Sequence, residues 1–359
     1  MKVNEFSAKI NVEKGVFFNP KMQSLRSISA AFVKANAPKN ARLIDATSAT
    51  GIRGIRYALE SGIKDQVLID MNSEAYANSL ANVKANGVDA EVENKSFQEF
   101  ANTREERFDI IDIDPFGSPA PLIYDAFKIS KGGTLLMVTA TDTAVLHGAH
   151  ANACIKTYGA VPMHTELCKE AGARILLAFI AKNAAQFNFG IVPMMCVSDM
   201  HYVRVFARIS HGAAEALSSM KSLGIASQCQ SCRYFEHSYG ICAVRDKCPK
   251  CNSKMLAAGR MWLGSMSNGT AVKNTAKAME KIGDANAAKQ IQAISKELDI
   301  PFFYSVPKIT KSLSIGSVSH KVVMQKLEEH GYRVSQTQFW KDSIKTDADY
   351  SFVAETVRS

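Results

Sequence analysis

The sequence of 359 residues predicts an α/β protein, in which a doubly wound parallel sheet precedes a smaller α+β domain. Short apolar or β-rich runs alternate with segments of helical spacing, which is typical of a parallel sheet with helices on both faces. This alternation stops near residue 211, and a cysteine-rich segment follows. We therefore expect two domains, residues 1–210 and residues 211–359.

Each expected element rests on a particular run of residues. Five runs have the length and apolar content of buried strands, and the segments between them have helical spacing. The strand-like runs are ARLIDAT, QVLIDM, DAEVEN, FDIIDID and GTLLMVTA, which begin at residues 41, 66, 89, 108 and 133. The other expected elements are helices at 52–62, 73–87, 173–187, around 271–298 and 319–331, and an antiparallel edge strand at 202–210.

Charge is unevenly distributed along the chain. Residues 1–210 carry 23 Lys and Arg against 21 Asp and Glu, whereas residues 211–359 carry 20 against 13. The second part therefore holds +7 of the net charge of +9, and a basic surface indicates a polyanionic partner such as a nucleic acid. Ordinary solubility charge is the alternative explanation.

The composition predicts a chain that does not enter a membrane. No stretch reaches the roughly 18 uninterrupted apolar residues that a bilayer-spanning helix needs. The first residues, MKVNEFSAKINVEK, contain no apolar signal region. We expect a cytoplasmic protein, and we expect it to be a monomer.

Four of the eight cysteines form two knuckles separated by fifteen residues, Cys229-x2-Cys232 and Cys248-x2-Cys251. This spacing is typical of a closed, structural zinc site with four thiolate ligands. Cys242, inside the intervening loop, is a possible substitute ligand. Disulfides are the competing interpretation, but the missing secretion signal disfavours them.

Residues that follow the predicted strands indicate a cofactor site, because ligands of open parallel sheets bind beyond the carboxyl ends of the strands. The first strand runs from Asp45 into a turn in which Thr47, Ala49 and Gly51 let a ligand approach the backbone. The second strand ends at Asp70, whose carboxylate can accept both hydroxyls of a ribose. An adenosine-containing cofactor is predicted, and the missing GxGxxG glycines favour S-adenosylmethionine over a dinucleotide. A helix cap at Asp45 and a surface turn at Asp70 are the structural alternatives.

The fourth predicted strand ends in the motif DIDPFGSP, residues 112–119. The exocyclic amine of a nucleobase is a poor nucleophile, and a carboxylate at Asp114 can accept its N–H bonds and relay the released proton. Phe116 can hold the flat base by stacking, and Pro115 fixes the turn that aims both side chains. The motif is typical of enzymes that methylate amino groups. A plain turn, with Asp112 in a structural role, is the alternative.

The sequence resembles the tRNA guanosine-26 N2-dimethyltransferase family over nearly its whole length. The segments that carry the resemblance are GVFFNPKMQSLR, DATSATGIRGIRYA, DIDPFGSP, TATDTAVLHGAHANACIKTYG, GRMWLG and IKTDA. The resemblance implies a class I methyltransferase domain with a Rossmann-like sheet. Such an enzyme uses S-adenosylmethionine to place one or two methyl groups on the 2-amino nitrogen of guanosine 26 in tRNA. It also implies a C-terminal domain that helps to bind the RNA.

The same resemblance implies roles for particular residues. Asp114 would be the catalytic acid/base, and Phe17 and Phe116 would hold the guanine between them. Arg26 would contact the methionine carboxylate. Around Ser27 and Ser96 the chain departs from the family pattern, which usually has N-R-D at the first place and an acidic residue at the second. The other implied cofactor contacts are Asp45, Thr47, Ala49, Gly51, Asp70, Ser96 and Phe97.

Other functions stay open on sequence alone. A methyltransferase that acts on adenine N6, on a different guanosine or on a protein amine would carry much the same residues. An NAD-dependent dehydrogenase would share the sheet and Asp70, but it should have the glycine fingerprint. A zinc-knuckle RNA-binding protein without catalysis would share the basic second part, but it would not need the DPFG turn. For a tRNA partner, the expected phosphate contacts are Lys247, Lys250, Lys254, Lys308 and Lys311.

Overall fold

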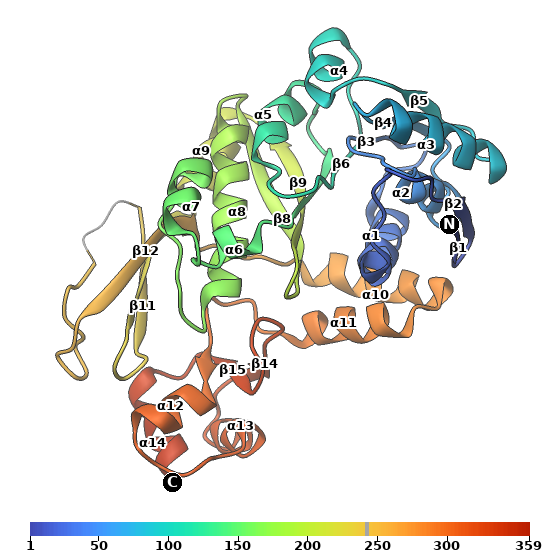
Figure 1. The fold of residues 1–359 in the computed structure, drawn as a ribbon. Helices are drawn as coiled ribbons and strands as arrows, with labels where there is room; N and C mark the ends of the chain where they lie inside the picture. Colours follow the sequence, from blue (N-terminus) through green and yellow to red (C-terminus); the bar gives the residue numbers. More distant parts are fainter. Residues whose placement is uncertain (241–243) are drawn as a thin grey trace.

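A seven-stranded sheet forms the centre of the computed structural model, which describes residues 1–240 and 244–359 (Figure 1). The strand order is β5-β4-β3-β6-β7-β9-β8, and β9 runs antiparallel to both its neighbours. The direction of winding reverses between β3 and β6, so a ligand crevice is expected beyond the carboxyl ends of these two strands. The strands are β3 (Arg42–Asp45), β4 (Asp65–Ile69), β5 (Glu91–Glu93), β6 (Ile110–Ile113), β7 (Leu135–Ala140), β8 (Phe189–Ser198) and β9 (Val203–His211).

The five predicted parallel strands are confirmed as β3 to β7. The run at 202–210 is confirmed as an antiparallel strand, but the prediction that it forms the edge is wrong, because β8 lies outside it. β8 was not predicted from the sequence, because Pro193 lacks the N–H that a central strand donates. An edge strand tolerates a proline, and this one lies where the pairing of β8 with β9 shifts its register.

Helices cover both faces of the sheet and create two apolar cores. Buried residues of the predicted helix at 173–187, confirmed as α8, pack on one face together with α4 and α5. Buried residues of α1 pack on the other face. Residues of α2 and α3 form a smaller cluster with the N-terminal hairpin. These elements are α1 (Gln23–Asn36), α2 (Ile52–Arg56) with its π-helical extension (Tyr57–Ser61), α3 (Ser73–Ala85), α4 (Phe97–Thr103), α5 (Ala120–Lys128), α8 (Cys168–Ala185), β1 (Lys2–Glu5) and β2 (Ala8–Asn11).

Two helices from the C-terminal part of the chain complete the second face. α10 (Gly269–Ile282) and α11 (Ala285–Lys296) pack on α1, and their buried residues share its apolar core. Asp284, between them, is buried and accepts a hydrogen bond of 2.8 Å from the Ser27 hydroxyl of α1. A fragment of residues 1–210 would therefore expose the apolar surface of α1.

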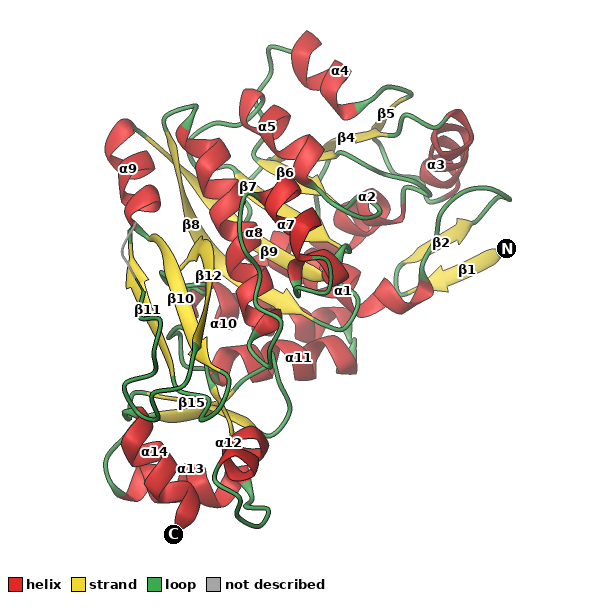
Figure 2. Ribbon diagram, turned by 60° about the vertical axis from the view of Figure 1, so that its left-hand side comes forward, coloured by secondary structure: helices red, strands yellow, loops and turns green. Residues whose placement is uncertain are grey.

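The remaining elements form two small antiparallel sheets, seen with their helices in Figure 2. The sheet β11-β10-β12 carries the cysteine knuckles, and the sheet β13-β15-β14 packs with three helices around an apolar core of its own. We call residues 304–359 the C-terminal module. None of the described helices is long and apolar enough to span a bilayer. The bounds are α6 (Thr143–Leu146), α7 (Ala151–Tyr158), α9 (Ala213–Lys221), β10 (Leu223–Cys229), β11 (Phe235–Tyr239), β12 (Met255–Trp262), β13 (Tyr304–Ser305), α12 (Val306–Ser312), α13 (His320–Glu329), β14 (Val334–Gln336), β15 (Ser343–Thr346) and α14 (Tyr350–Arg358).

Candidate active site

A cavity of about 620 Å³ lies beyond the carboxyl ends of β3 and β6, where the strand order reverses. This volume is in the usual range of small-molecule and cofactor sites. Most of the lining comes from the segment before α1, the loop after β3 and the turns after β6 and β7, and the rest from α1, α2 and the loop between β8 and β9. Six of the residues predicted from the sequence are part of it: Phe17, Arg26, Thr47, Ala49, Asp114 and Phe116.

Asp114 follows β6 and is held by Arg53 of α2. The Nε and Nη2 atoms of Arg53 lie 2.6 and 2.5 Å from Asp114 Oδ2, and Arg53 is buried. Burial raises the pKa of Asp114, but the positive charges of Arg53 and Arg204 outweigh this effect and hold the pKa below its usual value. Asp114 is therefore a carboxylate at neutral pH, which only accepts hydrogen bonds.

Asp112, the first carboxylate of the DIDPFGSP motif, has a structural role, which was the alternative interpretation of this residue. It is fully buried and does not line the cavity. Its carboxylate accepts a hydrogen bond of 2.7 Å from Arg204 and another from the Tyr57 hydroxyl. Arg204 donates a second bond of 2.6 Å to Thr139 of β7. Asp112 thus joins neighbouring strands beneath the site.

Phe17 and Phe116 face each other at the cavity. They are 57% and 85% exposed, which is unusual for phenylalanine. Their ring centroids lie 5.9 Å apart, and the ring planes meet at 63°. A flat base between two rings needs planes about 7 Å apart, twice the contact distance between carbon atoms. The rings must therefore move apart by about 1 Å and turn toward parallel to admit a base.

The loop after β3 has the features of a ligand cradle. Gly51 has a φ of 77°, and a Cβ added there would meet Ser79 Oγ at 2.6 Å, so only glycine fits. Asp45 Oδ2 and Ser48 Oγ are buried without a hydrogen-bond partner among the described residues, which is expected where a ligand completes the bonding. Burial and the charge of Asp112 raise the pKa of Asp45 to about 8. The donor set and the volume fit an adenosine-type cofactor.

The remaining predicted cofactor contacts lie near this loop or farther away. Asp70 directly follows β4, and its two carboxylate oxygens accept backbone N–H bonds of 2.9 Å from Ala49 and Asn72. Ser96 caps α4, and the Phe97 side chain packs in the apolar core. Their cofactor roles stay predictions. The predicted residues outside the cavity lining are Asp45, Gly51, Asp70, Ser96 and Phe97.

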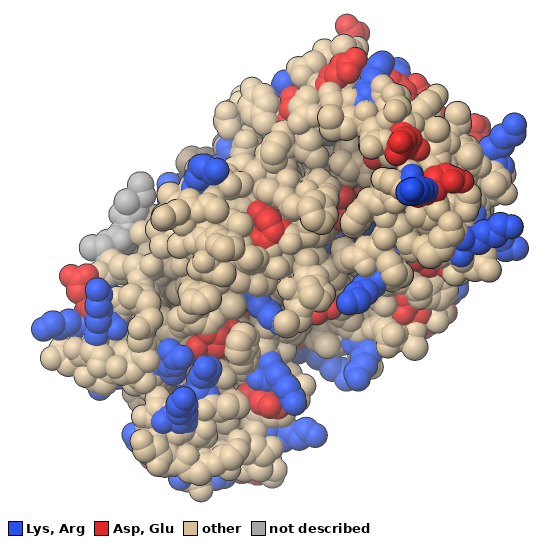
Figure 3. Space-filling model, in the orientation of Figure 1, with Lys and Arg blue, Asp and Glu red and all other residues tan. Residues whose placement is uncertain are grey.

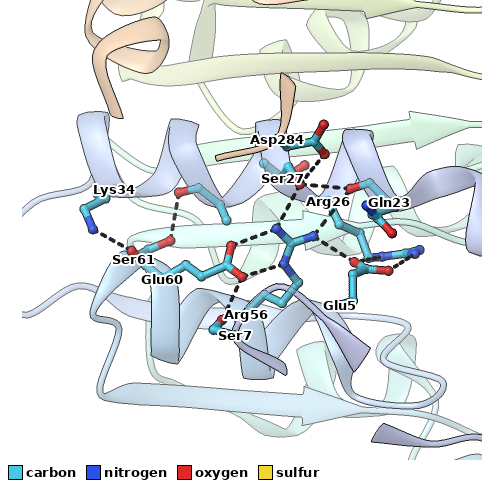
Figure 4. Close-up of polar contacts among 12 residues, drawn as sticks. Glu5, Ser7, Gln23, Arg26, Ser27, Lys34, Arg56, Glu60, Ser61 and Asp284 are labelled. Atoms are coloured by element: carbon cyan, nitrogen blue, oxygen red, sulfur yellow. Dashed lines mark hydrogen bonds and ion pairs between the residues drawn. The ribbon is translucent and has the colours of Figure 1, made fainter. Parts of the chain in front are cut away.

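Arg26 lines the cavity, but Glu5 of the N-terminal hairpin already holds its guanidinium (Figure 4). The Nε and Nη2 atoms of Arg26 donate to the two Glu5 oxygens at 2.7 and 2.6 Å. Arg56 binds the same carboxylate at 2.7 Å and also pairs with Glu60. A contact between Arg26 and a cofactor carboxylate would have to use the N–H groups that Glu5 leaves free.

The four knuckle cysteines converge on one point. Their Sγ atoms all lie within 4.8 Å of one another, and none of them is in a disulfide. Thiolates placed about 2.3 Å from a tetrahedral zinc ion have sulfur atoms about 3.8 Å apart. The distances of 3.4 Å from Cys229 to Cys251 and 3.5 Å from Cys232 to Cys248 are close to that value. The donor set fits a structural zinc ion, whereas Cys242 lies outside the described residues.

The cavity residues that were not predicted include Arg53, Asp142 and His201. Arg53 and Asp142 follow β3 and β7, the neighbours of β6, so the topology could have indicated both. Asp142 accepts a hydrogen bond of 2.9 Å from the Tyr158 hydroxyl, and burial raises its pKa. His201 comes from the loop between β8 and β9, and no signal pointed to it while β8 was unrecognised.

Comparisons with known proteins bear on this site. The family model described as N2,N2-dimethylguanosine tRNA methyltransferase matches residues 1–358. A tRNA (guanine(26)-N(2))-dimethyltransferase from Haloarcula marismortui is 34% identical, over 95% of this chain and 93% of the relative. The enzyme of the same name from Thermococcus kodakarensis is 34% identical, over 99% and 98%. The structure of Trm1 from Pyrococcus horikoshii with S-adenosyl-L-methionine has a TM-score of 0.92 at 33% identity and covers 99% of each chain.

Proposed function

The chain belongs to the N2,N2-dimethylguanosine tRNA methyltransferase family, and we propose that the cavity beyond β3 and β6 is its active site. The enzyme transfers one or two methyl groups from S-adenosylmethionine to the 2-amino nitrogen of guanosine 26 in tRNA, giving N2,N2-dimethylguanosine. One observation carries the choice of site: an ionised carboxylate, Asp114, shares one cavity with the two exposed rings of Phe17 and Phe116.

In this proposal the residues of the chain prepare the acceptor nitrogen. Asp114 accepts an N–H bond of the 2-amino group, which favours the pyramidal form with its lone pair outside the ring system. Bound S-adenosylmethionine supplies the electrophilic methyl group. The methylated nitrogen then loses one proton, which Asp114 relays to solvent. Because Arg53 keeps the pKa of Asp114 low, this carboxylate is ready to accept an N–H bond at neutral pH.

The loop after β3 is the proposed cofactor cradle. Thr47 and Ala49 line the cavity, and Ser48 offers an unsatisfied hydroxyl beside them. Asp70 is the proposed partner of the ribose hydroxyls, and Arg26 is the proposed partner of the methionine carboxylate. The remaining proposed contacts are Asp45, Gly51, Ser96 and Phe97.

Phe116→Ala should lower kcat/KM for tRNA by about 10-fold, because one stacking wall of the base site is removed. The affinity for S-adenosylmethionine should not change. Steady-state kinetics with unmodified tRNA and calorimetry with the cofactor measure the two quantities. Tyr124→Ala removes an exposed aromatic ring from α5, outside the cavity, and should leave kcat/KM unchanged. Equal activity of Phe116→Ala and the unaltered enzyme would contradict the base sandwich.

We propose further that the four knuckle cysteines hold one structural zinc ion. Elemental analysis should find about one zinc per chain, and Cys229→Ser should lose it while cofactor binding persists. The Tyr350 hydroxyl of α14 donates a bond of 2.5 Å to the backbone oxygen of Cys232. Hydrogen exchange should therefore increase in α14 as well as in β10. Cys168→Ser, outside the cluster, should retain the metal, and metal-free protein with native exchange rates would rule the zinc site out.

The basic second part is the proposed grip on the tRNA body. Lys and Arg gather over this part on the face seen in Figure 3, at lower left. Lys247, Lys254 and Lys311 are exposed and form no ion pair with other described residues. Lys250 also donates to Ser351 at 2.6 Å, and Lys308 is half-buried. All five remain proposed phosphate contacts, which position the RNA without reading its bases.

Reversing three of these charges, in Lys247→Glu/Lys254→Glu/Lys311→Glu, should raise the KM for tRNA by about 10-fold or more. The slope of log KM against log salt should become flatter by about one for each phosphate that the variant no longer binds. Lys64→Glu, at the amino end of β4 and away from the cavity, serves as the control. An unchanged KM and slope in the triple variant would place the tRNA grip elsewhere.

Tritium transfer from labelled S-adenosylmethionine to unmodified tRNA, followed by nucleoside analysis, tests the function itself. We expect label in N2-methylguanosine and N2,N2-dimethylguanosine, whereas label in methyladenosine or in protein would contradict the proposal. We also propose that the enzyme acts as a monomer in the cytoplasm, as its sequence predicts.

A further inference from the structure

Two motifs of the sequence that the active site does not use, GRMWLG and IKTDA, meet at a buried ionic cluster. The cluster comprises Glu170 and Arg174 of α8, Glu297 at the end of α11 and Lys345 of β15. None of these residues lines the active-site cavity. Their side chains are at most 7% exposed. We call these four residues the interdomain cluster.

Glu170 lies at the centre of the interdomain cluster. Its Oε1 accepts hydrogen bonds of 2.7 Å from Arg174 Nη2 and 2.8 Å from the backbone N–H of Phe302. Its Oε2 lies 3.2 Å from Lys345 Nζ. Burial raises the pKa of Glu170, but the charges of Lys345 and Arg174 outweigh it and keep the side chain ionised.

Each cation of the cluster binds a different accessory segment. Arg174 Nη1 donates to the backbone oxygens of Trp262 and Gly264, at 3.0 and 3.1 Å, where the sheet of the cysteine knuckles ends. Lys345 Nζ donates to Ile300 O at 3.0 Å and lies 3.2 Å from Glu297 Oε1. One helix of the catalytic sheet, α8, is thereby tied to β12, to the end of α11 and to the C-terminal module.

The surrounding contacts favour a single arrangement of these parts. Glu297 also accepts a hydrogen bond of 2.7 Å from Thr337, just after β14. Phe302 has a φ of 65°, an uncommon conformation for a residue with a side chain. Its backbone N–H donates the hydrogen bond that Glu170 accepts. The cluster holds two cations and two carboxylates, so each buried charge is compensated only while all the segments stay in place.

We propose that the interdomain cluster fixes the C-terminal module relative to the active-site cavity, which makes Lys345 a positioning residue for tRNA. This inference rests on the proposed function. A tRNA that is held by phosphates on the second part must deliver its guanosine to the cavity on the first. A fixed spacing between the two surfaces raises the effective concentration of that guanosine at Asp114, whereas a loose module lowers it.

The test is the double variant Lys345→Met/Glu297→Gln, which removes one cation and one carboxylate together. The Glu170–Arg174 pair stays intact, so no unbalanced charge remains buried. In assays well below the melting temperature of the double variant, its KM for tRNA should be about 10-fold or more above that of the unaltered enzyme. The kcat and the affinity for S-adenosylmethionine should stay within about two-fold of those of the unaltered enzyme. Hydrogen exchange should rise around residues 300–305 and 334–338.

Two controls separate positioning from loss of charge or loss of fold. Lys341→Met removes an exposed positive charge from the same module and should leave the KM for tRNA unchanged. The single variant Lys345→Arg keeps the charge, and its KM for tRNA should stay close to that of the unaltered enzyme. The inference is wrong if the double variant exchanges faster around 300–305 but retains the original KM, or if Lys341→Met raises the KM equally. Failure of the proposed function differs, since the unaltered enzyme itself would then not methylate guanosine in tRNA.

Discussion

Asp114→Asn is expected to lower the rate of methyl transfer to tRNA by about 100-fold or more, the usual scale for the removal of an acid/base group. The amide cannot accept N–H bonds as strongly as the ionised carboxylate, and it cannot take up the released proton. The pair with Arg53 is also weakened, yet the size and shape of the side chain are kept. Single-turnover assays with saturating tRNA measure the effect without interference from product release.

The control for this variant is Asp109→Asn, at the opposite end of the same strand. Asp109 pairs with Lys131 and does not line the cavity. It should therefore change the single-turnover rate by less than about two-fold, while both variants bind S-adenosylmethionine like the unaltered enzyme. A normal rate for Asp114→Asn would remove this residue from the mechanism.

Arg53→Met is expected to destabilise the protein by about 3 to 5 kcal/mol, because it removes the buried cation between Asp112, which is buried, and Asp114, which is partly buried. Arg53 pairs with Asp114 at 2.5 Å and lies 3.9 Å from Asp112. Urea unfolding at neutral pH measures the loss. Arg107→Met, which removes an exposed arginine, should change the free energy of unfolding by only about 0.5 kcal/mol.

The same variant should also change how the reaction depends on pH. Since Arg53 lowers the folded-state pKa of Asp114, their pairing stabilises the protein above the unfolded pKa and is lost as the pH falls through the lower, folded value. In the unaltered enzyme, Asp114 therefore stays ionised to a lower pH than an ordinary aspartate does. Arg53→Met removes the largest effect that opposes burial, so the pKa of Asp114 should rise. The rate should then fall with decreasing pH at a higher pH than before. Identical pH profiles would show that Arg53 does not tune Asp114.

The central fold was predictable because its strands are buried on both faces. Such strands appear as apolar runs, and the helices between them have helical spacing. The position of α10 and α11 was not predictable in the same way. Their sequences show that each helix has an apolar face, but only the tertiary structure shows that this face covers α1. β8 was not predicted because Pro193 makes the sequence of this edge strand resemble that of a loop.

The site was predictable where chemistry and strand ends coincide. Asp114 and Phe116 follow a buried strand in a motif suited to amine chemistry, and both line the cavity. Phe17 had no such signal, because a pair of phenylalanines is more often core, and only the family resemblance pointed to it. The pairing of Arg26 with Glu5 joins two segments through tertiary packing alone. Sequence spacing carries no information about contacts of that kind.

Single-turnover methyl transfer to two tRNAs that differ only at nucleotide 26 tests the central claim most directly. One carries guanosine and the other inosine, which lacks the 2-amino group that Asp114 is proposed to bind. We predict N2-methylguanosine and N2,N2-dimethylguanosine from the first tRNA and no methylated nucleoside at position 26 from the second. Methylation of the inosine tRNA at position 26, at a rate similar to that of the guanosine tRNA, would contradict the account.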